Sequence, residues 1–305
     1  MSKSRDQHWQ TLTTLLRCLM AAYAAILSSG CAALGPLSPL GPLERSLIYS
    51  HSPVAEQVAR DDGGGEDAWI TTADGVKLHG RFYEHANPRA VVLFCHGNAG
   101  SVAEWGAAAR QFSHRHQSTV LVFDYRGYGR SDGSPSEAGI LRDGRAARRW
   151  LAERTHVGEA DLILLGRSLG GAVAVDLAVD GGARGLILES TFTSLPDVAS
   201  QHLPWMLPHW NMTQRLNSLS KIGKYEGPLL QSHGDDDHVI PFVLGQKLHD
   251  AAPGPKRFVV IRGADHNDPQ SPDWDEAVDE FLDSLPGAQP PGGRSPANRP
   301  TTVDG

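Results

Sequence analysis

The sequence predicts an α/β fold in which a mostly parallel sheet is covered by helices on both faces. Apolar strand-like runs alternate with helix-like stretches along the chain, which is typical of successive strand–helix–strand units. The chain has 305 residues with 40% hydrophobic content, enough to bury one sizeable core. One folded domain is therefore expected, over residues 47–286.

The strands and helices of this domain are expected from residue 69 onward. Strand-like runs lie at residues 69–72, 77–83, 90–95, 161–165, 185–188, 228–233 and 256–262. Helix-like stretches lie near residues 102–114, 137–154, 169–179, 242–252 and 274–285. Residues 191–226 interrupt the alternation and leave the only room for a cap.

A candidate nucleophile lies where the run 161–165 meets the next helix-like stretch. Gly166-Arg167-Ser168-Leu169-Gly170 places a serine on a strand-to-helix turn, whose tight backbone requires small residues two positions before and after it. The same pattern recurs at Gly129–Gly133, but Ser131 lies among glycines and a proline, where no helix can begin. Ser168 is therefore the candidate, and Ser131 is interpreted as a loop serine.

A serine nucleophile needs a neutral imidazole to take its proton and a carboxylate to orient that imidazole. On turns of this kind the acid and then the histidine follow the serine, each at the carboxyl end of a later strand. His266 follows the run 256–262 and is the candidate base. The acid is expected among the consecutive Asp235, Asp236 and Asp237, which position alone does not separate.

The same chemistry needs donors for the oxyanion of a tetrahedral intermediate, and losing one donor typically costs about 3–4 kcal/mol. The run Ala90–Cys95 ends in His96-Gly97-Asn98-Ala99-Gly100, a glycine-rich turn that can aim backbone N–H groups into a cleft. The amides of Asn98 and Leu169 are therefore predicted to form an oxyanion hole.

Together these motifs resemble the single-domain alpha/beta hydrolases of the group that includes the Bem46-like proteins and the alpha/beta-hydrolase-domain depalmitoylases. The resemblance runs from about Leu47 to Leu285. It is carried by motifs in a fixed order: His96–Gly100, Asp124–Gly129, Gly166–Gly171, Glu189–Ser194, His233-Gly234 and His266–Asp268. It implies the alpha/beta-hydrolase fold, with about eight mostly parallel strands flanked by helices and a short cap at about residues 191–226.

The resemblance also implies which carboxylate serves as the acid. The family pattern places it four residues after His233, at Asp237, and leaves Asp235 and Asp236 as loop residues. Glu189 is a fallback acid, because related hydrolases sometimes carry the carboxylate at the end of that strand.

The cap sequence Pro204–Met212 contains two tryptophans and two methionines. One interpretation is an apolar wall for an acyl chain, and the other is packing of the cap onto the body of the domain. A cap this short favours a groove open to solvent over a deeply enclosed cavity.

The N-terminal residues predict export. Basic residues precede the apolar stretch Leu19–Leu27, which is shorter than the ~17 residues that span a bilayer, so residues 1–30 are predicted to be a signal peptide. Leu27-Ser28-Ser29-Gly30-Cys31 resembles a bacterial lipoprotein box, although Ser28 stands where leucine is usual. We expect a lipid on Cys31, a membrane-anchored protein of the cell envelope, a tether at 31–46 and a disordered tail at 287–305. Another cleaved signal, an uncleaved anchor and no export are the alternatives.

Several classes of function are disfavoured by composition. A formal net charge of −7 without a basic run argues against nucleic-acid binding. Cys95 lies in a predicted buried strand and is expected to be a core residue without a disulfide partner. A metal site at Asp235, Asp236, Asp237 and His238 is disfavoured because adjacent loop residues rarely converge on one ion. No metal or cofactor is expected.

The predicted function is hydrolysis of acyl esters or thioesters through an acyl-enzyme intermediate. The catalytic residues would be Ser168, His266 and Asp237, and the substrate a small-molecule or lipid acyl compound. The same groups could serve a serine aminopeptidase-like peptidase. A non-catalytic, membrane-tethered binding module is the alternative from a different class.

Overall fold

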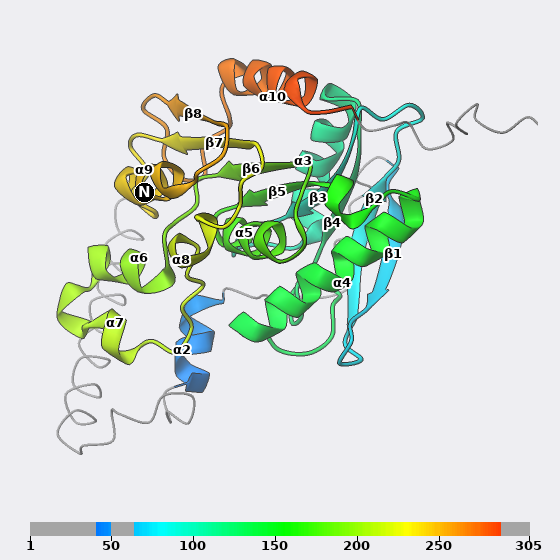
Figure 1. The fold of residues 1–305 in the computed structure, drawn as a ribbon. Coiled ribbons are helices and arrows are strands. Elements are labelled where there is room, and N and C mark those ends of the chain that lie inside the picture. The colour runs from blue at the N-terminus through cyan, green and yellow to red at the C-terminus, as the bar shows by residue number, and fades with distance from the viewer. Residues whose placement is uncertain (1–40, 50–63, 288–305) are drawn as a thin grey trace, which may run out of the picture.

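The computed structural model describes residues 41–49 and 64–287, and an eight-stranded sheet forms its centre (Figure 1). The strands lie in the order β1-β2-β4-β3-β5-β6-β7-β8, in which β2 is antiparallel to both of its neighbours, β1 and β4, and all other neighbouring pairs are parallel. Their bounds are β1 Glu66–Thr71, β2 Lys77–Tyr83, β3 Ala90–Cys95, β4 Ser118–Phe123, β5 Ile163–Arg167, β6 Gly185–Glu189, β7 Leu229–Gly234 and β8 Lys256–Ile261. The predicted mostly parallel sheet of about eight strands is confirmed.

Helices cover both faces of this sheet, as predicted (Figure 1). The helices α4 (Glu137–Thr155), α5 (Leu169–Gly181) and α9 (Phe242–Ala251) pack on one face, and α3 (Val102–Arg115) and α10 (Pro272–Ser284) on the other. Their bounds agree with the predicted stretches to within a few residues. Shorter helices are α2 (Gly41–Ile48), η2 (Glu159–Asp161), α6 (Leu195–His202), η3 (Pro204–Met206), α7 (Pro208–Asn211) and α8 (Leu219–Ile222).

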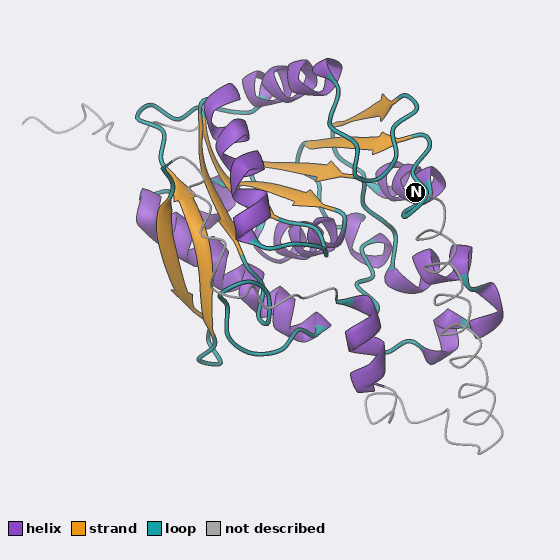
Figure 2. Cartoon of the chain, turned by 180° about the vertical axis from the view of Figure 1, so that it is seen from behind, coloured by secondary structure: helices purple, strands orange, loops and turns teal. Residues whose placement is uncertain are grey.

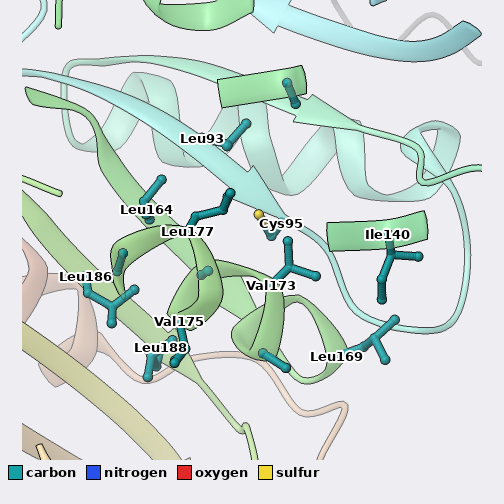
Figure 3. Packing of buried hydrophobic residues seen from close by; sticks show 14 of the residues in the cluster. Leu93, Cys95, Ile140, Leu164, Leu169, Val173, Val175, Leu177, Leu186 and Leu188 are labelled. Carbon is teal, nitrogen blue, oxygen red and sulfur yellow. The ribbon is translucent and has the colours of Figure 1, made fainter. Parts of the chain in front are cut away.

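The central strands read as continuous apolar runs because both of their faces are buried. Leu93 and Leu164 contribute to the core beneath α4 and α5, whereas the neighbouring Val92 and Ile163 contribute to the core beneath α3 and α10. Figure 3 shows the first of these cores, where α5 lies across β3, β5 and β6. This packing fixes the carboxyl ends of β5, β6 and β7 along one edge of the sheet.

The segment between β6 and β7 holds α6, η3, α7 and α8. The helices α6 and α7 project from one end of the molecule (Figures 1 and 2), whereas α8 packs against α5 and α9. Near the N-terminus the structure differs from expectation, because the helix α2 begins at Gly41, within the predicted tether 31–46. The Glu44 carboxylate accepts hydrogen bonds from the amides of Thr213 and Gln214, at 2.7 and 2.9 Å, so contacts with the cap segment stabilise this helix.

The predicted signal peptide, Cys31, residues 32–40 and the tail from residue 288 lie outside the described residues. Within residues 41–49 and 64–287, no helix combines the length and the apolar character needed to cross a bilayer.

Candidate active site

Ser168 occupies the sharp turn between β5 and α5. Its φ of 52° and ψ of −117° are a strained conformation for a residue with a side chain, typical of functional sites. The turn requires a glycine two residues after the serine, since a Cβ on Gly170 would lie 1.9 Å from the Cys95 carbonyl oxygen. The end of β3 and the start of α5 are thereby brought close to the serine.

Ser131, the serine of the second match, lies in a loop as predicted. Its hydroxyl donates to the Asp124 carbonyl oxygen at 2.8 Å and accepts from the His79 amide at 2.9 Å. These bonds fix the loop after β4.

The structure brings Ser168, His266 and Asp237 into one hydrogen-bonded row. His266 Nε2 lies 3.1 Å from Ser168 Oγ, and His266 Nδ1 lies 2.8 Å from Asp237 Oδ2. The three residues come from the turns after β5, β8 and β7, whose carboxyl ends meet at one edge of the sheet. The serine and histidine therefore lie within the range needed for proton transfer.

The Asp237 side chain is fully buried and has several donors around it. The amides of Val239 and Ile240 donate to Oδ1 at 2.9 and 2.7 Å, and His233 Nε2 lies 3.3 Å from Oδ2. Burial would raise the pKa of Asp237, but the hydrogen bonds from His233, His266 and Ile240 outweigh it and hold the pKa well below its ordinary value. Asp237 is therefore a carboxylate facing an imidazole.

The other candidate acids have different partners. Asp235 accepts from the Gly263 amide at 2.6 Å and pairs with Arg262 at 3.0 Å, and these bonds lower its pKa. Asp236 is exposed. No cluster of three metal-binding side chains converges within the described part of the chain.

Glu189, the fallback acid, does not contact the imidazole. Its carboxylate is buried at the end of β6, where it accepts from Trp274 Nε1 at 3.1 Å and lies 3.4 Å from Arg167 Nη1. Arg167 Nη2 in turn donates to the His266 carbonyl oxygen at 2.8 Å. Sequence reasoning missed this role of Arg167, which holds the histidine loop from the position just before Ser168.

The turn that follows β3 lies beside the serine. A Cβ on Gly97 would be 3.6 Å from Ser168 Cβ. The Asn98 side chain fixes this turn, because its Nδ2 donates to the Ile48 carbonyl oxygen at 2.5 Å and its Oδ1 accepts from the Tyr128 hydroxyl at 2.7 Å. Trp105 Nε1 donates to the Ala99 carbonyl oxygen at 2.8 Å.

Leu169, the other predicted donor, is the first residue of α5, a position whose N–H has no acceptor within the helix. Both predicted oxyanion donors thus belong to backbone that borders Ser168. Tyr128 lies within the Asp124–Gly129 motif of the sequence, but nothing in the motif indicates its bond to Asn98.

A cavity of about 280 Å³ opens beside Ser168. Its walls are mainly apolar and come from α2, the turn after β3, the start of the cap and the turn after β7. They include Ile48, Phe192, Leu195, Val198, Val239 and Ile240.

The cap contributes to this wall through other residues than expected. The described side chains of Pro204–Met212 do not line the cavity, and Trp205 and Trp210 are 46% and 83% exposed. Neither interpretation of this sequence, an acyl-chain wall or packing onto the body, fits these two tryptophans.

Cys95 is buried at the end of β3, and burial raises the pKa of its thiol. The thiol therefore stays protonated and packs as a core residue, in agreement with the prediction.

Comparison with known proteins agrees with this architecture. Residues 86–220 match the family described as serine aminopeptidase, S33. The uncharacterized protein MT2364 of Mycobacterium tuberculosis is 37% identical over 263 residues, which are 84% of this chain and 92% of that protein. The alpha/beta hydrolase domain-containing protein WAV2 of Arabidopsis thaliana is 33% identical over 222 residues, 67% of this chain and 66% of WAV2. The protein bem46 of Schizosaccharomyces pombe is 32% identical over 172 residues, 52% of this chain and 54% of bem46.

The fold is also shared with a solved esterase. The Pyrococcus furiosus esterase Pf2001 superposes with a TM-score of 0.64 at 19% identity, covering 78% of this chain and 98% of that one. Together with the strand order and the turn at Ser168, these similarities identify the group: the chain belongs to the alpha/beta-hydrolase family.

Proposed function

We propose that this protein is a serine hydrolase that cleaves acyl esters or thioesters through an acyl-enzyme intermediate. The observation that carries the proposal is the pair of hydrogen bonds that links Asp237 to His266 and His266 to Ser168, which lines an apolar cavity. An acyl chain would occupy the apolar walls and present its carbonyl carbon to Ser168 Oγ.

In the proposed reaction, Ser168 Oγ attacks the carbonyl carbon and its proton passes to His266 Nε2. Asp237 stabilises the imidazolium through the bond to Nδ1. The amides of Leu169 and Asn98 donate to the oxyanion. His266 then protonates the leaving alcohol or thiol, and a water deprotonated by the same imidazole releases the acid from Ser168.

The lining of the cavity favours an acyl substrate over a peptide with a free amino end. An aminopeptidase needs an anionic group for the substrate ammonium, since an unpaired buried charge is costly. Among the described residues that line the cavity, none is aspartate or glutamate, and the one charged side chain is Arg167. Peptidase activity is therefore the second candidate, supported by the family match alone.

A fluorophosphonate probe, which labels activated serines, tests the proposal. Wild type and Ser131→Ala should be labelled, and Ser168→Ala should not. Labelling that survives Ser168→Ala but not Ser131→Ala would reject the assignment, and an unlabelled wild type would favour a binding module. Rates on esters, thioesters and aminoacyl amides of graded length then separate the substrate classes.

We further propose that the protein is exported and held at the cell envelope by a lipid on Cys31. Support comes from the apolar stretch Leu19–Leu27 and the lipoprotein-like box that follows it.

A further inference from the structure

Large exposed apolar side chains gather at one end of the molecule. Of the six in the described part of the chain, five lie in the cap or in the turn and helix after β7: Trp205, Leu207, Trp210, Val239 and Val243. We call these five residues the cap patch. The sixth, Trp69, belongs to β1, the edge strand on the opposite side of the sheet (Figure 1).

The cap patch borders the mouth of the cavity. Val239 is both exposed and part of the cavity wall. The imidazole of His202, at the end of α6, lies 2.9 Å from the Val239 carbonyl oxygen, and Trp205 follows three residues later. In both views α6, α7 and α9 lie at the same end of the molecule (Figures 1 and 2). A surface that covered the cap patch would therefore meet the cavity entrance.

The N-terminal helix ties the same end of the molecule to the chain before it. Glu44 of α2 binds the amides of Thr213 and Gln214 in the cap segment, and Ile48 lines the cavity. Cys31 precedes the start of α2 by ten residues. A chain of this length spans at most about 36 Å, so a lipid on Cys31 would keep the cap close to the bilayer.

We propose that the cap patch docks on the surface of a phospholipid bilayer, so that the cavity receives its acyl substrate directly from the membrane. This inference rests on the proposed function and deepens it by naming the source of the substrate. Trp205 and Trp210 suit the contact because tryptophan combines a large apolar ring with one N–H donor and favours the membrane–water boundary. Docking through apolar side chains should persist at high salt, unlike attraction between charges.

Tryptophan fluorescence in vesicles of phosphatidylcholine brominated on its acyl chains tests this docking. Bromine quenches only indoles that reach the lipid. The mature chain, which begins at Cys31 once the predicted signal peptide is removed, should be quenched at both 0.1 M and 1 M salt, and the double variant Trp205→Phe/Trp210→Phe should lose most of that quenching. Trp69→Phe is the matched control, because it removes an exposed tryptophan from the opposite edge and should leave the quenching unchanged.

A disruptive variant adds a functional readout. Trp210→Asp should reduce hydrolysis of a vesicle-embedded ester at least tenfold and leave hydrolysis of a short soluble ester within twofold, since Trp210 does not line the cavity. Quenching that is absent, lost at 1 M salt, or unchanged in the double variant would overturn the docking, as would equal loss of both hydrolytic rates. Quenching needs no turnover and can be measured on Ser168→Ala, so failure of docking and failure of the hydrolase proposal are separate results.

Discussion

Replacement of Asp237 by asparagine removes the charge of the proposed acid and keeps its shape. The new side chain can still accept from the amides of Val239 and Ile240, which bind Oδ1 at 2.9 and 2.7 Å. Its NH₂ group then faces His266 Nδ1. Because that group donates, it favours the tautomer with the imidazole proton on Nε2, beside Ser168, and this tautomer cannot take the serine proton.

The expected effect on catalysis is much larger than the effect on folding. Loss of the correct tautomer lowers kcat by about 10⁴, which corresponds to about 5.5 kcal/mol of transition-state stabilisation. The free energy of unfolding loses chiefly the charge-assisted bond to His266, worth about 1.5–3 kcal/mol. Since domains are typically stable by about 5–15 kcal/mol, Asp237→Asn should remain folded while it loses activity.

The same variant should change how stability depends on pH. The pKa of Asp237 is depressed in the folded protein, below the ordinary value of 3.8. The stabilisation is therefore fully present above the ordinary value and is lost as the pH falls toward the folded-state value. In urea unfolding at pH 3–6, wild type should lose stability at the acid end, and Asp237→Asn should lose less.

The matched control is Asp236→Asn, because Asp236 is the preceding residue and 66% of its side chain is exposed. Hydrolysis of a short chromogenic ester at neutral pH should stay within twofold of wild type in this control. A kcat above a tenth of the wild-type value in Asp237→Asn, or an equal loss of kcat in Asp236→Asn, would refute the role of Asp237 as the acid.

Three further predictions concern the turn, its support and the N-terminus. In urea unfolding, Gly170→Ala should lower the free energy of unfolding by about 3 kcal/mol or more, because its Cβ would lie 1.9 Å from the Cys95 carbonyl oxygen. The control Gly223→Ala should change this free energy by less than about 0.5 kcal/mol, because the nearest atom to its Cβ would be 3.9 Å away. Arg167→Met should lower kcat about 10- to 100-fold with little change in KM, since the His266 carbonyl loses its donor, and Arg167→Lys should restore part of the rate. Radiolabelled palmitate should enter the wild-type chain and not Cys31→Ser, and labelling that survives this change contradicts the lipoprotein hypothesis.

The sequence could predict those parts of the molecule that depend on local pattern and chain order. The strands β3, β5 and β6 are short apolar runs between turn residues, so their existence and burial follow from composition. The rule that the ends of parallel strands meet at one edge of a sheet brings together Ser168, His266 and the loop that carries the three aspartates. The choice of Asp237 among those aspartates came from the resemblance to the alpha/beta hydrolases.

The parts that the sequence could not predict depend on contacts between distant segments. The helix α2 has only eight residues, too few to be stable alone, and is held by the bonds of Glu44 to the cap segment. The orientation of Trp205 and Trp210 is a second case. Their apolar character indicates burial, but η3 and α7 are single turns that leave both side chains exposed.

The pairing of Arg167 with Glu189 shows how strand register selects the acid. The two residues face each other in the parallel pair β5–β6, so their side chains lie on the same side of the sheet. Arg167 and Trp274 occupy the two carboxylate oxygens of Glu189, and Arg167 reaches on to the His266 carbonyl. Glu189 therefore supports the histidine loop through Arg167, and its two oxygens bind Arg167 and Trp274 instead of the imidazole. It follows that Glu189 cannot rescue Asp237→Asn while Arg167 is present, because the arrangement that positions His266 is the one that withholds this second carboxylate from it.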